Sequence, residues 1–364
     1  MSIATTPRVS RAAKPMRLRM RGLSLIELMI AMTISLIVLA AVGWVYQGTV
    51  QTYRNHDALS RMQEGARYAF ELISKDLRMA GTTGCPFQTS ANVLNGAEDD
   101  WYKNLFGQPI VNLDKNGTAD TVTELSDALS ILRADISNEY IVSSHDSAGA
   151  VFTLTKEHDI PQGALLVATD CNNAAVFQAS AVSATTVTHA AGAGTPGNST
   201  VNLGNGGGAI TYPAGSRLYR LNAVTYYVGK NAAGEPSLFR LTPKGADATP
   251  TPEELVEGVE DLQVTFGVDT STPRDGIVDM AVAGAPYVTA SWIDDPAQAA
   301  ALGATAKERW DRVVSVRVSM LMRTVEDRVI PVKQKYSFNG TNGIDPGDRR
   351  LRKVFTHVIQ VRNR

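Results

Sequence analysis

The chain has 364 residues, of which 44% are apolar and 20% are charged, a composition typical of a folded protein. Its formal net charge of −1 conceals an uneven distribution, because residues 1–22 hold six basic residues and no acidic one. The remaining 342 residues hold 29 basic against 36 acidic residues and therefore carry about −7. This balance argues against nucleic acid as a partner, since phosphate binding requires a basic surface.

A long apolar run follows the basic start. From Leu28 to Tyr46 only three of 19 residues are not apolar, and as a helix this run would rise about 28 Å. That length matches a hydrocarbon core of about 30 Å, and the basic residues before it would keep the amino terminus in the cytoplasm. One acidic residue, Glu27, directly precedes the run.

Three interpretations of this segment compete. A secretory signal peptide has the same charge order, and small residues occur at 41–43, but its apolar region is shorter, about 7–15 residues, and excludes a carboxylate. A plain transmembrane anchor leaves Glu27 unexplained, because an acid at depth costs about 2.5–3.5 kcal/mol. The third interpretation depends on a resemblance.

The sequence GLSLIELMIA at residues 22–31 resembles the class III signal of type IV prepilins and pseudopilins, with Leu23 in place of the usual phenylalanine. The resemblance implies that a prepilin peptidase cuts after Gly22 and that the new amino terminus, Leu23, is methylated. It also implies that Glu27 faces the amino terminus of a neighbouring subunit during assembly. Such a pair is attractive in a low-dielectric core, where an unpaired acid is costly.

The helical pattern continues beyond the membrane run. Apolar residues recur every three or four positions on one face: Leu59, Met62, Ala66, Ala69, Ile73, Leu77 and Ala80. No proline occurs between Leu23 and Ala80, so one helix of 58 residues, about 87 Å long, is predicted. Gly43, Gly48 and Gly65 are expected weak points, and Gly81 is a plausible carboxy-terminal cap.

Residues 82–364 read mainly as short strands rich in β-branched and aromatic residues, separated by turns such as 159–163, 213–215, 234–236 and 339–347. The glycine-rich tract at 190–208 predicts a surface loop, and it lacks the lysine of a phosphate-binding loop. Residues 251–262 predict a short helix leading into a strand, with Thr251 and Glu254 as a capping box.

Cys85 and Cys171 are the only cysteines, so the composition allows either one disulfide or two unrelated thiols. Several stretches resemble the PilW family of type IV pilus minor pilins: LRMAGTTGCP at 77–86, SDALSILRA at 126–134, VATDCNNAAVFQAS at 167–180 and the final strands. The resemblance implies an α+β, type IV pilin-like fold with the long helix on a mainly antiparallel sheet. It also implies a Cys85–Cys171 disulfide.

Recognised catalytic motifs are missing from the sequence. It contains no H-E-x-x-H and no G-x-S-x-G, and its five histidines, at 56, 145, 158, 189 and 357, read as surface or strand residues. No enzyme activity and no cofactor are expected. Asp269, Asp275 and Asp279 resemble a calcium turn of PilW-like proteins, but too few oxygen ligands accompany them, which favours a plain Asp-Gly hairpin and no metal.

A basic cluster at residues 349–353 reads as a solvated strand edge, with an acidic docking partner as the alternative. The resemblance divides the chain into a leader (1–22), a membrane half of the helix (23–50), an amphipathic half (51–81) and an exported β-rich domain (82–364). It implies a minor pilin in the inner membrane and then in the pilus, with the prepilin peptidase, other minor pilins, the major pilin and a tip adhesin as partners.

Two other functions remain open from the sequence. A minor pseudopilin of type II secretion shares the fold and the signal. A membrane-anchored periplasmic enzyme is the alternative of another class, although no catalytic constellation supports it.

Overall fold

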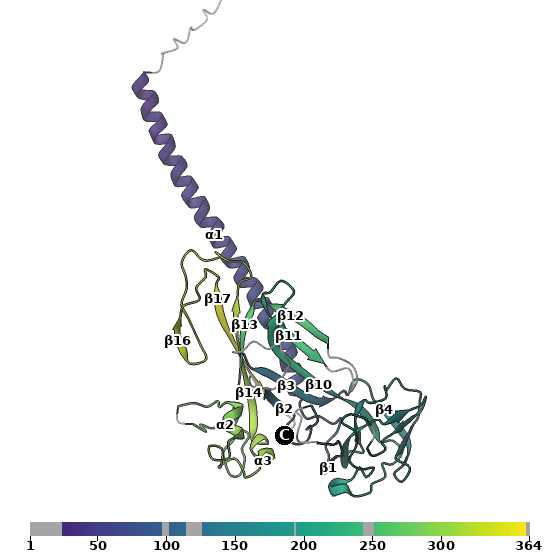
Figure 1. The fold of residues 1–364 in the computed structure, drawn as a ribbon. Helices are drawn as coiled ribbons and strands as arrows, with labels where there is room; N and C mark the ends of the chain where they lie inside the picture. Colours follow the sequence, from purple (N-terminus) through teal and green to yellow (C-terminus); the bar gives the residue numbers. More distant parts are fainter. Residues whose placement is uncertain are drawn as a thin grey trace, which may run out of the picture. The chain divides into compact units, whose positions relative to one another are not determined.

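The structure is a computed structural model that describes residues 24–96, 102–113, 126–192, 194–242, 251–282 and 284–361. The chain divides into two compact units, residues 1–54 and 55–364, each considered by itself. Helix α1 (Leu25–Arg78) is continuous over 54 residues and includes Gly43, Gly48 and Gly65, so the predicted long helix is confirmed (Figure 1). Gly81, at φ +73°, donates its N–H to the carbonyl of Leu132 at 2.9 Å and so joins the end of the helix to a strand.

Among the described residues the strands form three sheets. The largest contains β1 (Thr89–Asn92), β2 (Ile110–Leu113), β3 (Ala128–Ala134), β4 (Tyr140–Asp146), β5 (Val151–Leu154), β6 (Leu165–Thr169), β7 (Asn173–Gln178), β8 (Ala181–Val182), β9 (Thr186–Thr188), β10 (Arg217–Lys230), β11 (Pro236–Thr242) and β12 (Thr251–Glu257). The second contains β13 (Val259–Val268), β14 (Val313–Arg323) and β17 (Arg352–Gln360), and β15 (Tyr336–Phe338) pairs with β16 (Thr341–Ile344). The short helices are α2 (Ala290–Asp294), α3 (Ala306–Trp310) and the 3₁₀ turn Asn205–Gly207.

Strand β10 connects two regions of the largest sheet. Its first residues, Arg217 to Arg220, pair with β6, and Arg217 and Leu218 also pair with β4. Residues from Leu221 to Tyr226 pair with β3, and those from Thr225 to Lys230 pair with β11. Every pairing except β1 with β7 is antiparallel, which confirms the α+β class with a mainly antiparallel sheet.

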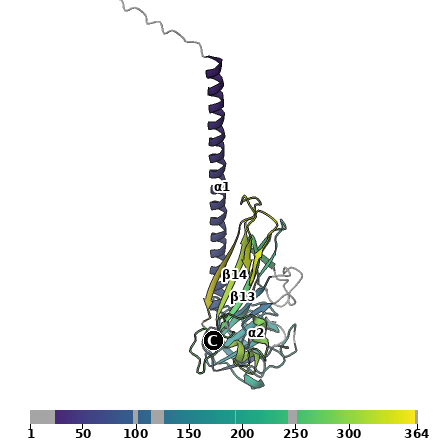
Figure 2. The ribbon, with the colours of Figure 1, turned by 90° about the vertical axis from the view of Figure 1, so that its left-hand side faces the viewer.

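The main core lies between the second half of α1 and the sheets. Six of the seven predicted stripe residues are fully buried, all except Leu59, and they pack with apolar residues of β10, β13 and β14. Figure 2 shows β13 and β14 running alongside this part of α1. A second cluster, centred on Phe152 and Phe177, fills the region of β4 to β9.

The secondary structure expected from the sequence differs from the structure in several segments. Residues 251–257 form strand β12 and not a helix, because they pair with β11 and bury Val256 in the main core. Residues 341–344, expected within a turn, form β16. Helix α3 was not expected, although Thr305 and Glu308 form a complete capping box at its start.

Candidate functional site

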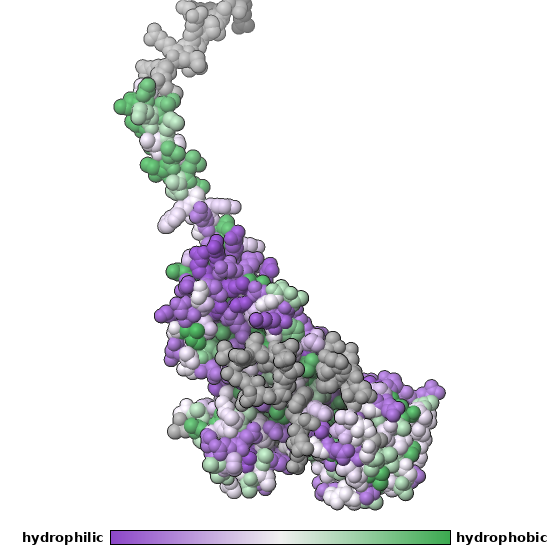
Figure 3. All heavy atoms as spheres, viewed as in Figure 1, coloured by the Kyte–Doolittle hydropathy of each residue, from purple (hydrophilic) through white to green (hydrophobic). Residues whose placement is uncertain are grey.

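The first half of α1 is the candidate membrane segment. It is the one helix among the described residues that is long and apolar enough to cross a membrane, with a mean hydropathy of 2.5 over its best 18-residue window. Its large apolar side chains, from Leu25 to Tyr46, are all exposed, and Figure 3 shows green, apolar residues over much of this part of the helix. An exposed apolar surface of this size requires lipid or other subunits around it.

The carboxylate of Glu27 belongs to a capping box at the start of α1. The backbone N–H of Ser24 donates to Glu27 Oε2 at 3.1 Å, and the backbone N–H of Glu27 donates to Ser24 Oγ at 3.2 Å. These two bonds satisfy backbone donors that a helix start leaves free. Gly22 and Leu23, the expected cleavage and methylation residues, lie outside the described residues.

The second half of α1 is held closely against the sheets at Gly65. A Cβ atom at this position would lie 2.8 Å from Val256 Cγ1 of β12 and 3.5 Å from Met322 Cε of β14. Any side chain at residue 65 would force Val256 to shift, so glycine allows this close approach of the helix to β12.

A buried ionic cluster fixes the end of α1 to the largest sheet. We call it the Asp76 cluster, and it comprises Asp76, Arg133 of β3, Tyr226 of β10 and Arg240 of β11. The carboxylate of Asp76 accepts a 2.6 Å hydrogen bond from Tyr226 and pairs with Arg133 at 3.3 Å and Arg240 at 3.6 Å. Burial first, and then the negative charge of Asp76, raises the pKa of Tyr226, so its hydroxyl stays a donor.

The sequence interpretation missed this cluster. A signal was present, because Asp76 follows Ile73 by three residues and precedes Ala80 by four, which places a charge on the apolar stripe. An acidic residue at such a position needs a buried partner.

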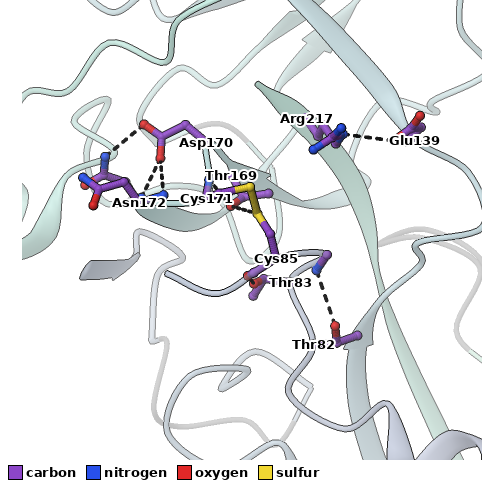
Figure 4. The surroundings of a disulfide bond; sticks show 11 residues. Thr82, Thr83, Cys85, Glu139, Thr169, Asp170, Cys171, Asn172 and Arg217 are labelled. Carbon is purple, nitrogen blue, oxygen red and sulfur yellow. Dashed lines mark hydrogen bonds and ion pairs between the residues drawn. A yellow bond between two sulfur atoms is a disulfide. The ribbon is translucent and has the colours of Figure 1, made fainter. Parts of the chain in front are cut away.

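A disulfide joins the loop after α1 to the turn between β6 and β7. Cys85 and Cys171 are bonded across a sequence separation of 86 residues (Figure 4). Cys171 has φ +66°, and Asp170 stabilises the turn by accepting hydrogen bonds from the N–H groups of Asn172 at 2.9 Å and Asn173 at 2.6 Å. Closing a loop of this length contributes about 4–5 kcal/mol in the chain-entropy treatment.

The three aspartates proposed as calcium ligands bind backbone groups of their own loop. Asp269 accepts from the N–H groups of Ser271, Asp275 and Gly276 at 2.8–3.0 Å. Although burial opposes it, hydrogen bonding from Gly276 and the other loop donors lowers the pKa of Asp269.

Asp279 accepts from Thr270 and Ser271, and Asp275 accepts from the N–H of Ile277. In the described parts of the chain no group of three or more acidic, histidine or cysteine residues is placed to hold a metal ion. The three aspartates therefore stabilise their own loop by accepting hydrogen bonds from its backbone N–H groups and from two of its hydroxyl groups.

The sequence predicted that the basic cluster at residues 349–353 is a solvated strand edge. This prediction is wrong for Arg350 and Arg352, which form ion pairs. Arg350 pairs with Glu235 at 3.1 Å, and Arg352 pairs with Glu260 at 2.7 Å. Arg323 joins the two acids at 2.6 Å and 2.9 Å. We call this set, with Asp348, the arginine network.

Two of the five histidines form a buried pair that the sequence did not reveal. His145 of β4 and His189, which follows β9, approach at 3.0 Å between their Nε2 atoms, and only one of them can donate in that bond. They lie among Phe152, Phe177 and Tyr212. Burial lowers the pKa of each to about 4, with the charge of Asp146 opposing this at His145.

The comparisons with known proteins follow this geometry. Residues 225–363 match the family model described as Type IV Pilus-assembly protein W, which covers the second half of β10 and all later elements. Residues 17–43 match the prokaryotic N-terminal methylation motif, which covers the start of α1. No curated protein and no solved structure matches the chain. Both family matches confirm the resemblance to PilW-type minor pilins: the later part of the chain is similar to the PilW family, and its start is similar to the methylation motif.

Proposed function

We propose that this protein is a minor pilin that acts in type IV pilus assembly and performs no catalysis. The main support for the proposal is that one helix, α1, connects the two regions of the chain that match known families. Helix α1 begins within the methylation motif, and its second half packs into a β-rich domain whose later part matches PilW.

The proposed maturation follows the class III signal. The leader, residues 1–22, is removed after Gly22, and Leu23 becomes the methylated amino terminus. Residues 23–50 hold the subunit in the inner membrane, which the exposed apolar surface of α1 supports. Residues 51–81 connect it to the domain of residues 82–364 in the periplasm, and the whole mature chain later enters the pilus.

Glu27 has the assembly role in this proposal. Within one chain its carboxylate already caps the helix through Ser24, and both residues are exposed. A neighbouring amino terminus would offer the same carboxylate a full positive charge in an apolar core, where the attraction is strong. Correct stacking of neighbouring subunits would thus depend on Glu27.

The partners in this proposal are other minor pilins, the major pilin and a tip adhesin, in a complex that primes assembly and stays at the fibre tip. The Asp76 cluster and the disulfide support such a role, since both fix the chain around the end of α1. A domain secured in this way keeps its surfaces in place relative to the second half of the helix.

The intact mass of the membrane-extracted protein tests the maturation. We expect a chain that begins at Leu23 and carries one added methyl group. A chain that begins between Ala41 and Trp44 would indicate a secretory signal, and an uncut chain would indicate a plain anchor. Either result would overturn the proposed maturation.

A deletion strain tests the assembly role. We expect fewer pili and reduced twitching, with normal type II secretion. Normal twitching together with lost secretion would assign the chain to a pseudopilin complex instead. Complementation with the full-length gene is the matched control.

A further inference from the structure

The flank of α1 next to β17 carries an open groove. It is lined by α1 residues between Gln63 and Arg78, by Met79 after the helix and by Phe355 and His357 of β17, and its volume is about 880 Å³. Its apolar floor includes Phe70, whose ring lies 5.3 Å from the ring of His357. All of these residues belong to the unit that begins at residue 55. We call it the β17 groove.

The groove is positively charged. Arg67, Lys75 and Arg78 line it with Glu71 as the one acidic residue, and Arg67 and Lys75 form no ion pair within the described part of the chain. Charge complementarity therefore favours an acidic occupant.

A buried hydroxyl also lacks a partner in this groove. Ser74 is 7% exposed, and its Oγ makes no hydrogen bond to any described residue. Buried polar groups are normally hydrogen-bonded, and an unpaired one costs about 1–3 kcal/mol.

Strand β17 borders the groove, and among the described residues one of its two edges has no strand partner. The sheet order is β13-β14-β17, and β17 pairs with β14 in an unbroken register from Arg352 to Gln360. Edge strands are normally protected by proline, by bulges or by charge. Strand β17 has no proline and no bulge, and Lys353 is its one exposed charged residue apart from the histidine.

Strand β12, at an edge of the largest sheet, shows the contrast. Strand β12 contains Pro252 and three exposed glutamates, and its ladder with β11 has a register shift at Leu238 and Phe239. These features discourage pairing with another strand. The chain thus protects β12 and leaves β17 able to accept a strand.

We propose that the β17 groove receives the acidic edge strand of a neighbouring pilin-type subunit, which adds to β17 as a further strand. Its backbone pairs with β17, its acidic side chains face Arg67 and Lys75, and its apolar side chains cover Phe70 and Phe355. The inference rests on the proposed function, because a neighbouring subunit is present only if the chain assembles into a pilus.

Site-specific photocrosslinking in the producing bacterium tests this inference with the full-length chain. A photoreactive amino acid replaces Glu71, and the crosslinked peptide is sequenced by mass spectrometry from sheared pili. A second probe replaces the exposed Lys156, outside the groove, as a control. We expect the Glu71 probe alone to link to an acidic extended segment of a protein that carries a methylation motif.

Charge reversal supplies the second measurement. We expect Arg67→Glu with Lys75→Glu to reduce the crosslink on the order of tenfold, because it replaces attraction by repulsion. Lys156→Glu should leave the yield unchanged. Arg67 and Lys75 are both exposed on the surface of α1, so the fold should tolerate their substitution.

The possible outcomes separate the two proposals. If the mature chain is present in fibres but the Glu71 probe links to nothing, or to a segment that is not acidic, the groove inference is overturned and the proposed function stands. If the mature chain is absent from fibres, the proposed function fails, and the groove inference fails with it.

Discussion

The hydroxyl of Tyr226 donates a 2.6 Å hydrogen bond to the carboxylate of Asp76 across 150 residues of sequence. Both side chains are buried, and Arg133 completes the contact with a side chain that is 9% exposed. The last turn of α1 is thereby linked to β3 and β10 by charge as well as by apolar packing.

Removing the carboxylate is therefore expected to destabilise the domain strongly. Asp76→Ala should lower the free energy of unfolding by about 3–5 kcal/mol, because it leaves Arg133 buried without its partner. Tyr226→Phe removes one hydrogen bond and should cost about 1 kcal/mol. Urea denaturation of the detergent-extracted chain, followed by tryptophan fluorescence, measures both, and equal losses would contradict a charge-centred role for Asp76.

The arginine network supplies a prediction with an adjacent control. Arg352 is 6% exposed and binds Glu260, whereas Lys353 is exposed. Hydrogen bonding to Arg352, opposed by burial, lowers the pKa of Asp348, so the pair stays ionised at neutral pH. Arg352→Ala should cost about 3–5 kcal/mol and Lys353→Ala less than about 0.5 kcal/mol in the same unfolding measurement. Similar values for the two variants would restore the view of a solvated basic edge.

The sequence predicted the parts of this fold that depend on local periodicity. The apolar spacing from Met62 to Ala80 identified the buried face of α1, because a 3.6-residue period is visible without tertiary information. The alternation of apolar and polar residues identified β10, β13 and β14, because a two-residue period is also visible without tertiary information. The start of the methylation motif was readable because Gly22 and Glu27 lie in one short stretch.

Features that depend on distant partners were not predictable in this way. Asp76 and Tyr226 meet only after β10 has packed on the helix, and the partners of Arg352 include Glu260, 92 residues earlier. Residues 251–257 have strong helix-start signals, but pairing with β11 overrides them. The contact of His145 with His189 likewise depends on β4, β5 and β9 being neighbours in the sheet.

The histidine pair predicts a loss of stability in acid. Because each pKa is lowered to about 4 in the folded state, the unfolded chain takes up these protons first as the pH falls below about 6.5. The stability from the two neutral rings is thus complete above about pH 6.5 and is lost progressively towards pH 4. The slope should reach about 1.4 kcal/mol per pH unit for each ring that takes up a full proton.

Unfolding free energies between pH 7 and pH 4.5 measure this slope. His145→Gln with His189→Asn should flatten it. A wild-type slope equal to that of the double variant would show that other groups cause the acid sensitivity.

Glu27 allows charge and helix capping to be separated, because glutamine can replace glutamate in a capping box. Glu27→Gln should keep the hydrogen bonds to Ser24 and lose the charge, whereas Glu27→Ala should lose both. If the carboxylate attracts a neighbouring amino terminus, both variants should reach the membrane and be cut normally, yet enter sheared pili at least tenfold less often than the wild type. Immunoblots of membranes and of sheared pili measure the two quantities. Normal incorporation of Glu27→Gln with poor incorporation of Glu27→Ala would assign the residue to helix capping, since only the uncharged capping function survives in glutamine.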